Sequence, residues 1–386
     1  MTIDNKKIAI IGGGPGGLTL ARLLQLKGAD VKVYERDANA QVRQQGATLD
    51  LHEDSGLRAL TQAGLMDEFK KYYRLGADKM KLTDQHAVVV LNDHDQKETG
   101  QFGDEHFRPE IDRGPLRDIL IASLKPGTIE WNAHYQSMEK RNGRWLIHFK
   151  SGKTAEADLL IAADGANSKI RSFVSDIQPV YSGITIVEGN IYHADQNAPQ
   201  LNALVQGGKL FALGKEKSII LSAKGEGSLS FYTGTKEAAD WVKSAGIDFD
   251  DKQAVLKWFR QRFNDWDPLW EELFSADEMY IVPRPMYHYP LDQSWVSQPD
   301  ITLIGDAAHR MPPYAGEGVN MAMLDALELS ECLTAIEYTT TAEAISAYEI
   351  KMLKRAGEVT EETLRQTEAL HGEDGLEYLV KMFSLH

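Results

Sequence analysis

The alternation of apolar and polar segments along the chain predicts an α/β fold. Residues 8–11 form an apolar run short enough to be a buried parallel strand. Between residues 18 and 24, apolar side chains recur at helical spacing, and residues 31–34 predict a second strand. The order strand, helix, strand is typical of a βαβ unit in a Rossmann-like parallel sheet.

The same patterning predicts the elements that follow. A stripe of apolar positions predicts a helix over 54–73 with Asp54 as its N-cap, and residues 88–91 predict a strand. Pro115 suits the first turn of a helix that runs to residue 124, with Arg113 just before it. A small β-meander and a further buried strand are then expected, at 128–131, 135–141, 144–150 and 157–163.

The pattern changes between residues 178 and 285, where short strand-like segments are joined by turns. Strands are expected at 185–192, 203–205, 209–213, 218–223 and 228–232, and a helix at 252–263. A buried strand at 301–304 and a helix after Asn320 return to the first pattern. We therefore expect a discontinuous first domain at 1–177 and 286–340, into which a mostly antiparallel domain is inserted at 178–285. A helical segment follows at 341–386. Residues 79–100 could belong to either domain.

Composition narrows the function classes. The 386 residues are enough for two domains, and 42% hydrophobic with 26% charged residues is ordinary for a globular enzyme. The net charge of −15 repels phosphate backbones and anionic lipid, so neither nucleic acid nor membrane is expected as a partner. The single cysteine, Cys332, excludes an internal disulfide, and no leader-like pattern or apolar run of ~20 residues is found. We expect a cytoplasmic monomer without a metal site.

The first strand ends in a glycine turn, Gly12-x-Gly14-x-x-Gly17, that opens the first helix. These glycines suit a tight turn, close approach of the backbone to a pyrophosphate, and packing of helix on strand. The helix N-terminus offers free N–H groups to phosphates. Glu35 ends the second strand, 23 residues after Gly12, where an acid can hydrogen-bond a ribose. The unit predicts dinucleotide binding without deciding between NAD and FAD.

Two later motifs favour FAD. The first is Asp164-Gly165, after the strand at 157–163. The second begins after the strand at 301–304 and comprises Gly305, Asp306, His309, Pro313, Gly316, Gly318 and Asn320. In this order and spacing, the three motifs resemble those of the group A FAD-dependent monooxygenases, of the para-hydroxybenzoate hydroxylase fold. The resemblance covers most of the chain.

The resemblance implies FAD as the resident cofactor and NADPH or NADH as its reductant. In the family, O₂ forms a flavin C4a-hydroperoxide that hydroxylates an aromatic or polycyclic, tetracycline-like small molecule. Because the chain has one glycine fingerprint, NAD(P)H is expected to dock transiently. Asp306 suits a ribityl hydroxyl, and the helix N-terminus after Gly316 suits negative charge on a reduced flavin. The cofactor residues implied are Gly12, Gly14, Gly17, Glu35, Arg36, Arg43, Asp50, Arg113, Asp164, Gly165, Gly305, Asp306, Pro313, Gly316, Gly318, Val319 and Asn320.

Within the family, segments 46–52, 109–117 and 309–316 most resemble tetracycline-inactivating enzymes of the TetX type. This resemblance implies that Arg43 lies near the nicotinamide route. It also implies a set of substrate contacts on the inserted sheet and beside the flavin. These are Glu188, Lys209, Phe211, Ser230, Pro313, Tyr314 and Gly316.

Three of these positions depart from the TetX pattern. A Gln, an Arg and a His of those enzymes fall here on Glu188, Lys209 and Ser230. Lys lacks the bidentate fork of Arg, and Ser lacks the reach of His. Glu188 and Lys209 could pair with each other, contact the substrate, or be ordinary strand residues. The scaffold therefore matches better than the tetracycline contacts.

Alternatives remain open. Arg113 could be a solvated arginine near a helix start rather than a cofactor ligand. A flavin-dependent halogenase would share the fold, but its W-x-W-x-I-P signature does not occur in the sequence. A non-enzymatic FAD-binding redox sensor would bind FAD without turnover, and an assay of NAD(P)H oxidation separates it from an enzyme.

Overall fold

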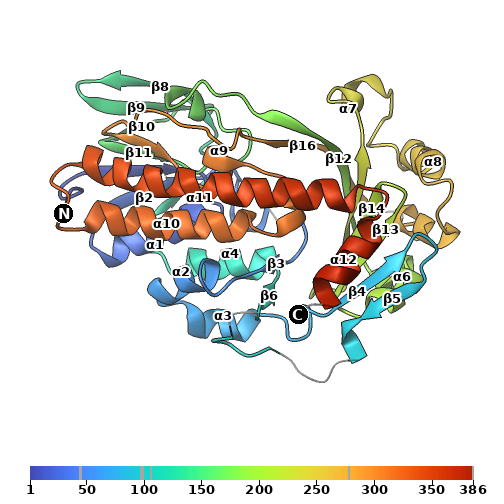
Figure 1. The fold of residues 1–386 in the computed structure, drawn as a ribbon. Helices are drawn as coiled ribbons and strands as arrows, with labels where there is room; N and C mark the ends of the chain where they lie inside the picture. The colour runs from blue at the N-terminus through green and yellow to red at the C-terminus, as the bar shows by residue number, and fades with distance from the viewer. Residues whose placement is uncertain (43–45, 96–99, 105–106, 277–278, 385–386) are drawn as a thin grey trace.

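The protein is built on two sheets that lie side by side (Figure 1). The computed structural model describes residues 1–42, 46–95, 100–104, 107–276 and 279–384. The first sheet is parallel throughout, in the order β17-β11-β1-β2-β7, which confirms the predicted Rossmann-like core. Its strands are Lys7–Ile11 (β1), Asp30–Tyr34 (β2), Ile129–Glu130 (β7), Leu159–Ala162 (β11) and Ile301–Leu303 (β17).

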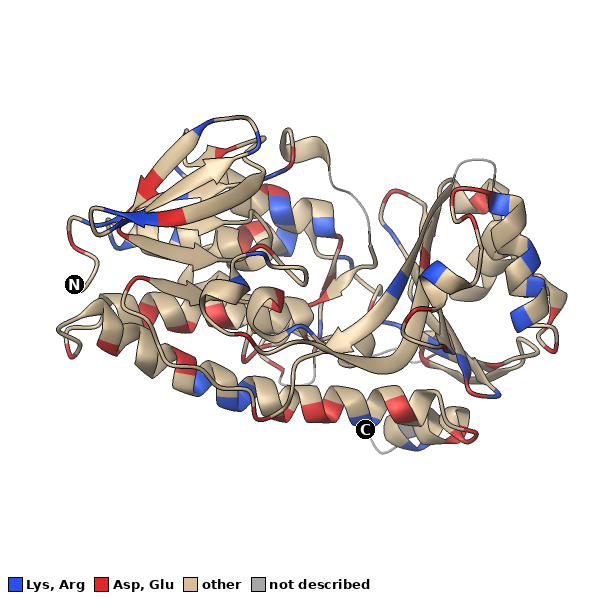
Figure 2. Cartoon of the chain, turned by 90° about the horizontal axis from the view of Figure 1, so that it is seen from above, with Lys and Arg blue, Asp and Glu red and all other residues tan. Residues whose placement is uncertain are grey.

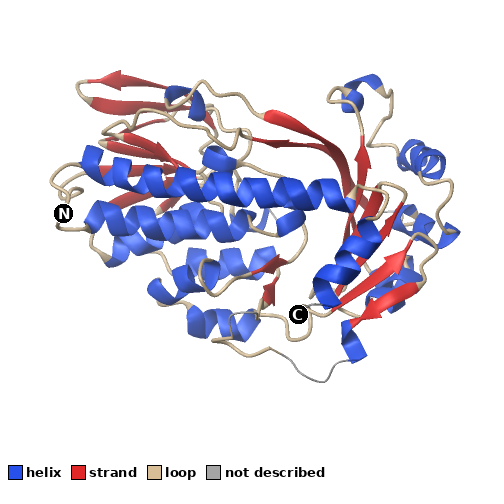
Figure 3. Cartoon of the chain, viewed as in Figure 1, coloured by secondary structure: helices blue, strands red, loops and turns tan. Residues whose placement is uncertain are grey.

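Helices cover the parallel sheet because its buried strands need apolar partners. α1 packs on α10, which in turn packs on the long α11 (Figure 3). Pro15 occupies the first turn of α1, and Thr340 and Glu343 form a capping box at the start of α11. The helices of this half are Pro15–Leu26 (α1), Gly56–Gln62 (α2), Met66–Tyr72 (α3), Arg113–Ala122 (α4), Asp306–His309 (α9), Gly318–Thr334 (α10) and Thr341–Leu370 (α11).

Two small antiparallel sheets complete this half. One is three-stranded, in the order β10-β9-β8, and its Phe149 ring stacks on Tyr34 of the parallel sheet with the centroids 5.0 Å apart. The other pairs β3 with β6. Short 3-10 helices lie at 40–42, 171–173 and 313–315. The strands are Leu49–Asp50 (β3), Glu110–Ile111 (β6), Tyr135–Arg141 (β8), Arg144–Phe149 (β9) and Thr154–Ala157 (β10).

The second large sheet has seven strands in the order β16-β12-β15-β14-β13-β4-β5, and only β13 and β4 are parallel neighbours. One face packs on helices α5 (Ala194–Asn197), α6 (Pro199–Val205), α7 (Trp241–Ser244) and α8 (Lys252–Arg262), with 3-10 turns at 93–95 and 268–274. The other face turns toward the parallel sheet (Figure 1). The strands are Met80–Asp84 (β4), Val89–Asn92 (β5), Val180–Ile191 (β12), Lys209–Gly214 (β13), Lys217–Ala223 (β14), Leu229–Lys236 (β15) and Met279–His288 (β16).

The C-terminal helices connect the two halves. α11 runs along α10, and its end at Leu370 reaches the seven-stranded sheet. α12 (Gly375–Ser384) packs on β4 and β13 through Leu379, against Met80 and Leu82. The expected helices of 341–386 are confirmed. We keep the predicted domain division as a proposal, now with β4 and β5 in the second sheet.

Several predicted elements are wrong in detail. Residues 203–205 end α6 rather than forming a strand, since Pro199 sets the helical φ at the helix start. The segment at 128–131 contributes β7 to the parallel sheet instead of joining the meander. The strand at 157–163 divides at Asp158, whose carboxylate accepts a hydrogen bond from Lys7 N at 2.8 Å. Arg113 is the first residue of α4 rather than preceding it.

Other elements were split or missed. The helix at 54–73 is two helices, because Gly64 adopts φ +71° between α2 and α3, and Ser55 rather than Asp54 is the N-cap. β4 and β16 were not predicted. β4 looks polar in sequence, yet its buried Lys81 donates a hydrogen bond to the Leu204 carbonyl at 2.9 Å. A lysine that satisfies its charge in this way conceals a buried strand.

Charge is dispersed over the molecule. Both basic and acidic side chains occur along α11 and on both halves (Figure 2). Among the described residues, no helix combines the length and apolarity that a bilayer crossing requires. The part of the chain that the structure describes also contains no group of His, Cys, Asp and Glu side chains arranged to hold a metal ion.

Candidate functional site

The glycine turn after β1 has the shape that a phosphate-binding turn needs. A β-carbon on Gly12, which adopts φ +113°, would lie 2.2 Å from the Ala163 carbonyl oxygen. One on Gly17 would lie 2.2 Å from the Gly12 carbonyl oxygen. A β-carbon on Gly14, by contrast, would meet no described atom within 4 Å. Gly12 and Gly17 therefore pack strand and helix together, and Gly14 leaves its backbone approachable.

Glu35 reaches this turn from β2. It is 3% exposed, and its carboxylate accepts hydrogen bonds from Gly13 N at 2.5 Å and Asp37 N at 2.9 Å. Arg117 holds Asp37 through a 3.0 Å ion pair, so the loop after β2 is fixed beside the turn. Arg36 is exposed next to Glu35. Arg43, expected near the nicotinamide route, lies outside the described residues.

The segment after β17 is held by a buried acid of α10 that the sequence analysis did not single out. Gly305 adopts φ +60°, and its N–H donates to Asp325 Oδ2 of α10 at 2.8 Å. The same oxygen lies 2.5 Å from His309 Nε2, and Asp325 Oδ1 accepts from Arg355 of α11 at 2.8 Å. Burial opposes both charges, but their interaction raises the pKa of His309 and lowers that of Asp325. This network fixes the turn at Gly305 and Asp306, which we call the GD turn.

Asp306 combines accessibility with dense surroundings. Its side chain is exposed to solvent, yet the protein atoms around it desolvate the carboxyl and raise its pKa, against the charges of His309, Arg113 and Arg310. A β-carbon on Gly318 would lie 4.0 Å from Asp306 Oδ1, so the start of α10 meets the carboxylate there.

β3 joins the same place from another part of the chain. A β-carbon on Gly316, at φ +71°, would lie 3.1 Å from Asp50 Oδ1. The buried Asn320 side chain donates to the Asp50 carbonyl at 2.9 Å and accepts from His52 N at 3.0 Å. Burial would raise the pKa of Asp50, but Lys209 and His52 hold it well below its usual range. The N-terminus of α10, with the half-buried Val319, is thereby tied to β3.

Arg113 lies between these segments. Its Nε donates to the Ala47 carbonyl at 3.0 Å, and a β-carbon on Gly46 would lie 2.7 Å from that nitrogen. Its positive charge lowers the pKa of both Asp306 and Tyr232, against burial that raises each. Arg113 therefore stands near the GD turn on one side and the seven-stranded sheet on the other.

The Asp164-Gly165 segment is joined to the GD turn by a buried arginine. Gly165 adopts φ +81° with open space beside it, and Asp164 accepts from Lys169 N at 3.0 Å. Arg171 donates to the Ala307 and Ala308 carbonyls at 3.1 and 2.8 Å. Its guanidinium carbon lies 3.5 Å from the Tyr289 ring centroid. Burial lowers the pKa of Arg171. The two carbonyl oxygens and the Tyr289 ring take the place of the water that would otherwise solvate its guanidinium.

These features fit FAD. Open backbone at Gly14 and Gly165, an accessible carboxylate at Asp306 and a helix N-terminus after Gly316 converge from four segments of the chain. A dinucleotide needs phosphate contacts without side-chain bulk, and acids for its hydroxyl groups. The arrangement supplies both.

Strand register places the predicted substrate residues on one face of the seven-stranded sheet. Glu188 pairs with Tyr232, which pairs with Ile220, which pairs with Phe211. Directly opposed residues point to the same side, and the Tyr232 hydroxyl accepts from Ala47 N at 3.3 Å, so that side faces the parallel-sheet half. Tyr232, Ile220 and Phe211 are half-buried. We call these three residues the apolar strip.

Two ion pairs bound the apolar strip, and they remove one of the alternatives left open for Glu188 and Lys209. Glu188 does not pair with Lys209. Instead Glu188 binds Arg284 of β16, and Lys209 binds the buried Glu110 of β6. Ser230 is 2% exposed, and its hydroxyl donates to the Ser222 carbonyl oxygen at 3.4 Å. Tyr232 and Arg284 were missed, because neither belongs to a sequence motif.

Tyr314 connects the 3-10 turn at 313–315 with the seven-stranded sheet and with the end of α11. Its hydroxyl lies 3.2 Å from His371 Nε2, and Ser218 Oγ lies 3.1 Å from the same nitrogen. The other ring nitrogen of His371 lies 2.8 Å from the Thr367 carbonyl oxygen. Burial lowers the pKa of His371 to about 4, so at neutral pH it is uncharged and Nε2 accepts. Pro313 begins the short 3-10 turn that carries Tyr314.

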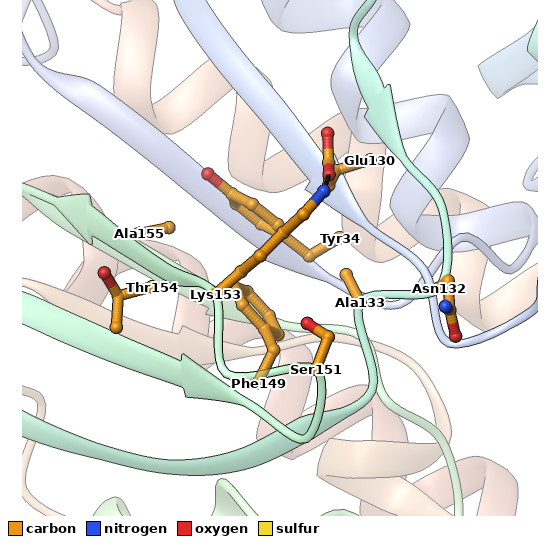
Figure 4. A pocket seen from close by; sticks show the side chains of 9 residues that line it. All are labelled: Tyr34, Glu130, Asn132, Ala133, Phe149, Ser151, Lys153, Thr154 and Ala155. Atoms are coloured by element: carbon orange, nitrogen blue, oxygen red, sulfur yellow. Dashed lines mark hydrogen bonds and ion pairs between the residues drawn. The ribbon is translucent and has the colours of Figure 1, made fainter.

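A separate cavity of about 240 Å³ opens between β2, β7 and the three-stranded sheet (Figure 4). Lys153 extends across it to Glu130, with Nζ 2.6 Å from Oε1. None of the predicted cofactor or substrate residues lines it. Its lining is Tyr34, Glu130, Asn132, Ala133, Phe149, Ser151, Lys153, Thr154 and Ala155.

Comparison with known proteins agrees with this geometry. A family model described as FAD binding domain matches residues 5–363. The monooxygenase asqM of Emericella nidulans is 28% identical over 93% of this chain and 94% of its own, and the 3-amino-4-hydroxybenzoate 2-monooxygenase PtmB3 of Streptomyces platensis is 28% identical over 96% and 90%. The solved tetracycline destructase Tet(51) has a TM-score of 0.70 at 20% identity, over 96% of this chain and 94% of its own, a likeness of fold. This chain belongs to the FAD-binding, group A monooxygenase family that its three motifs indicated.

Proposed function

We propose that the protein is an FAD- and NAD(P)H-dependent monooxygenase that hydroxylates an aromatic small molecule. The observation that carries this proposal is the position of the apolar strip. Ala47 links Tyr232 of the strip to Arg113, because its N–H donates to the Tyr232 hydroxyl and its carbonyl accepts from Arg113. The charge of Arg113 also acts on Asp306. A planar ring lying on the strip would therefore sit beside the residues that fit FAD.

When bound, FAD would supply electron transfer and the activation of O₂. Glu35, Asp50, Arg113 and Asp306 would hold it, together with the backbone of the three glycine-bearing turns. The chain would bring the substrate close, shield it from water and supply charge near the flavin. Arg36 and Arg43 remain candidates for cofactor contacts, and Pro313, Tyr314 and Gly316 for the substrate side.

The substrate class is proposed from the strip and from the relatives. The strip presents half-buried apolar side chains that suit an aromatic ring, and PtmB3 is named for an aminohydroxybenzoate. A tetracycline is the second candidate, supported by the shared fold with Tet(51). It is the weaker one, because Lys209 is already neutralised by Glu110, and Ser230 is buried.

The test begins with purified protein reconstituted with FAD. Aromatic compounds are screened for those that accelerate NADPH or NADH oxidation, with hydrogen peroxide measured in parallel. We expect substrates that speed oxidation without matching peroxide release. A protein that binds FAD but shows no reduction by either nicotinamide would be a sensor and would contradict the proposal. Size-exclusion chromatography would test the monomer.

A further inference from the structure

The apolar strip has unequal ends. At one end, Lys209 pairs with the 2%-exposed Glu110, and the charges of Asp50 and, more weakly, Arg108 also act on it. An anionic ligand group there would meet carboxylates whose counter-ion is already used. Moving Lys209 away would also leave a buried charge unpaired, which is costly.

The other end is electropositive and accessible. Arg284 lies on the edge strand β16 with 46% of its side chain exposed, and its one described ion-pair partner is Glu188. The charges of Arg284 and Arg113 both lower the pKa of Tyr232, whereas burial and Glu188 raise it. Arg284, Arg113 and Glu188 therefore all lie close enough to Tyr232 for their charges to act on it.

Register places Arg284 within reach of a ring on the strip. Glu188 lies directly opposite Tyr232, and Arg284 lies opposite Ile186, the next inward-facing residue of β12. Adjacent strands are about 4.8 Å apart. Because the guanidinium already reaches the Glu188 carboxylate, it also comes within about one strand spacing of the Tyr232 position.

We propose that Arg284 anchors an acidic group of the substrate and that Glu188 is its internal counter-ion while no substrate is bound. The inference rests on the function proposed above. It assigns specificity for aromatic carboxylates to the β16 end of the strip and not to Lys209. A carboxylate on a single ring over Tyr232 would accept hydrogen bonds from Arg284 in the manner of Glu188.

The two partners give opposite predictions. Arg284→Gln should weaken binding of an aromatic acid by about 10- to 100-fold, the range for losing a charge-assisted hydrogen bond. Glu188→Gln keeps the side-chain shape but removes the competing carboxylate, so it should tighten binding by about threefold or more. A variant that merely perturbs the sheet would weaken binding in both cases.

The experiment uses FAD-loaded protein and two matched probe pairs, 3-amino-4-hydroxybenzoate and 6-hydroxynicotinate, each against its carboxamide. Dissociation constants are read from perturbation of the flavin absorbance, without turnover. Arg260→Gln is the matched control, since Arg260 forms a 2.7 Å pair with Glu271 on the α8 side of the sheet. We expect wild type and control to prefer the acids, Arg284→Gln to lose this preference, and Glu188→Gln to increase it.

Three outcomes would overturn the anchor: no acid bound by wild type, equal affinity for acid and amide, or an unchanged preference in Arg284→Gln. FAD content and reduction by NAD(P)H are measured on the same samples. If FAD is bound and reduced while the preference ignores Arg284, the anchor fails and the proposed function stands. If the acids bind through Arg284 but NAD(P)H never reduces the FAD, the proposed function fails instead.

Discussion

Replacing Asp325 by Asn should destabilise the protein more than any surface substitution. The Asp325 carboxylate accepts from Gly305 N, His309 and Arg355 and is fully buried. Asn keeps the size but removes the charge that the two cations share. Breaking one partner out of a buried ion pair costs about 3–5 kcal/mol, a large part of the ~5–15 kcal/mol that folds a typical domain.

The effect should depend on pH in a direction set by both groups. Since the folded pKa of Asp325 is lowered, its contribution to stability is present above its unfolded value near 4 and is lost as the pH falls through the folded value. The pKa of His309 is raised, so its contribution is full below about 6.5 and is lost as the pH rises through the folded value. The free energy of unfolding should therefore differ more between wild type and Asp325→Asn at about pH 6 than at about pH 9.

Urea unfolding of FAD-saturated protein, followed by circular dichroism, measures this difference. Glu328→Gln is the control, because it removes the other partner of Arg355, at 2.6 Å, and leaves Gly305 and His309 untouched. We expect a smaller loss there, since Glu328 is partly exposed. Equal unfolding free energies for wild type and Asp325→Asn, or a loss no greater than in the control, would refute the reasoning.

Two further predictions concern the cofactor and the substrate. Asp306→Ala should lower FAD occupancy, read as flavin absorbance per protein, while the circular dichroism spectrum is unchanged, because the side chain is exposed and lies outside the buried apolar core. Full occupancy would remove Asp306 from the site. Lys209→Arg with Ser230→His should raise tetracycline-dependent NADPH oxidation only slightly, since Glu110 still neutralises position 209; a large gain would show that Lys209 faces the substrate.

Much of the cofactor half could be predicted because the role of each residue depends on the backbone next to it in the sequence. A glycine that avoids a clash, such as Gly12, or an acid at a strand end, such as Asp306, is fixed by local geometry and so forms a contiguous motif. Strands β1 and β11 were predictable for the same reason, since each centres on a short apolar run, whereas β7, with only Ile129 and Glu130, was assigned to the meander.

The residues that support and extend the site act across the fold, and no motif marks them. Arg171 contacts carbonyls 136 and 137 residues away, and Arg284 meets Glu188 96 residues away. Asp325 did leave a signal, as the single acid among the buried and mostly apolar residues of α10. The sequence left the partners of Glu188 and Lys209 open because both lie on one sheet face, while their actual partners come from β16 and β6.

The central claim is that this chain inserts one atom of O₂ into an aromatic substrate. The most direct measurement incubates FAD-loaded protein, NADPH or NADH and a substrate from the screen under ¹⁸O₂, and analyses the product by mass spectrometry. The account predicts a product that carries one ¹⁸O atom and is absent without the nicotinamide. Complete conversion of the reducing equivalents to hydrogen peroxide, with unlabelled substrate recovered throughout the screen, would contradict it.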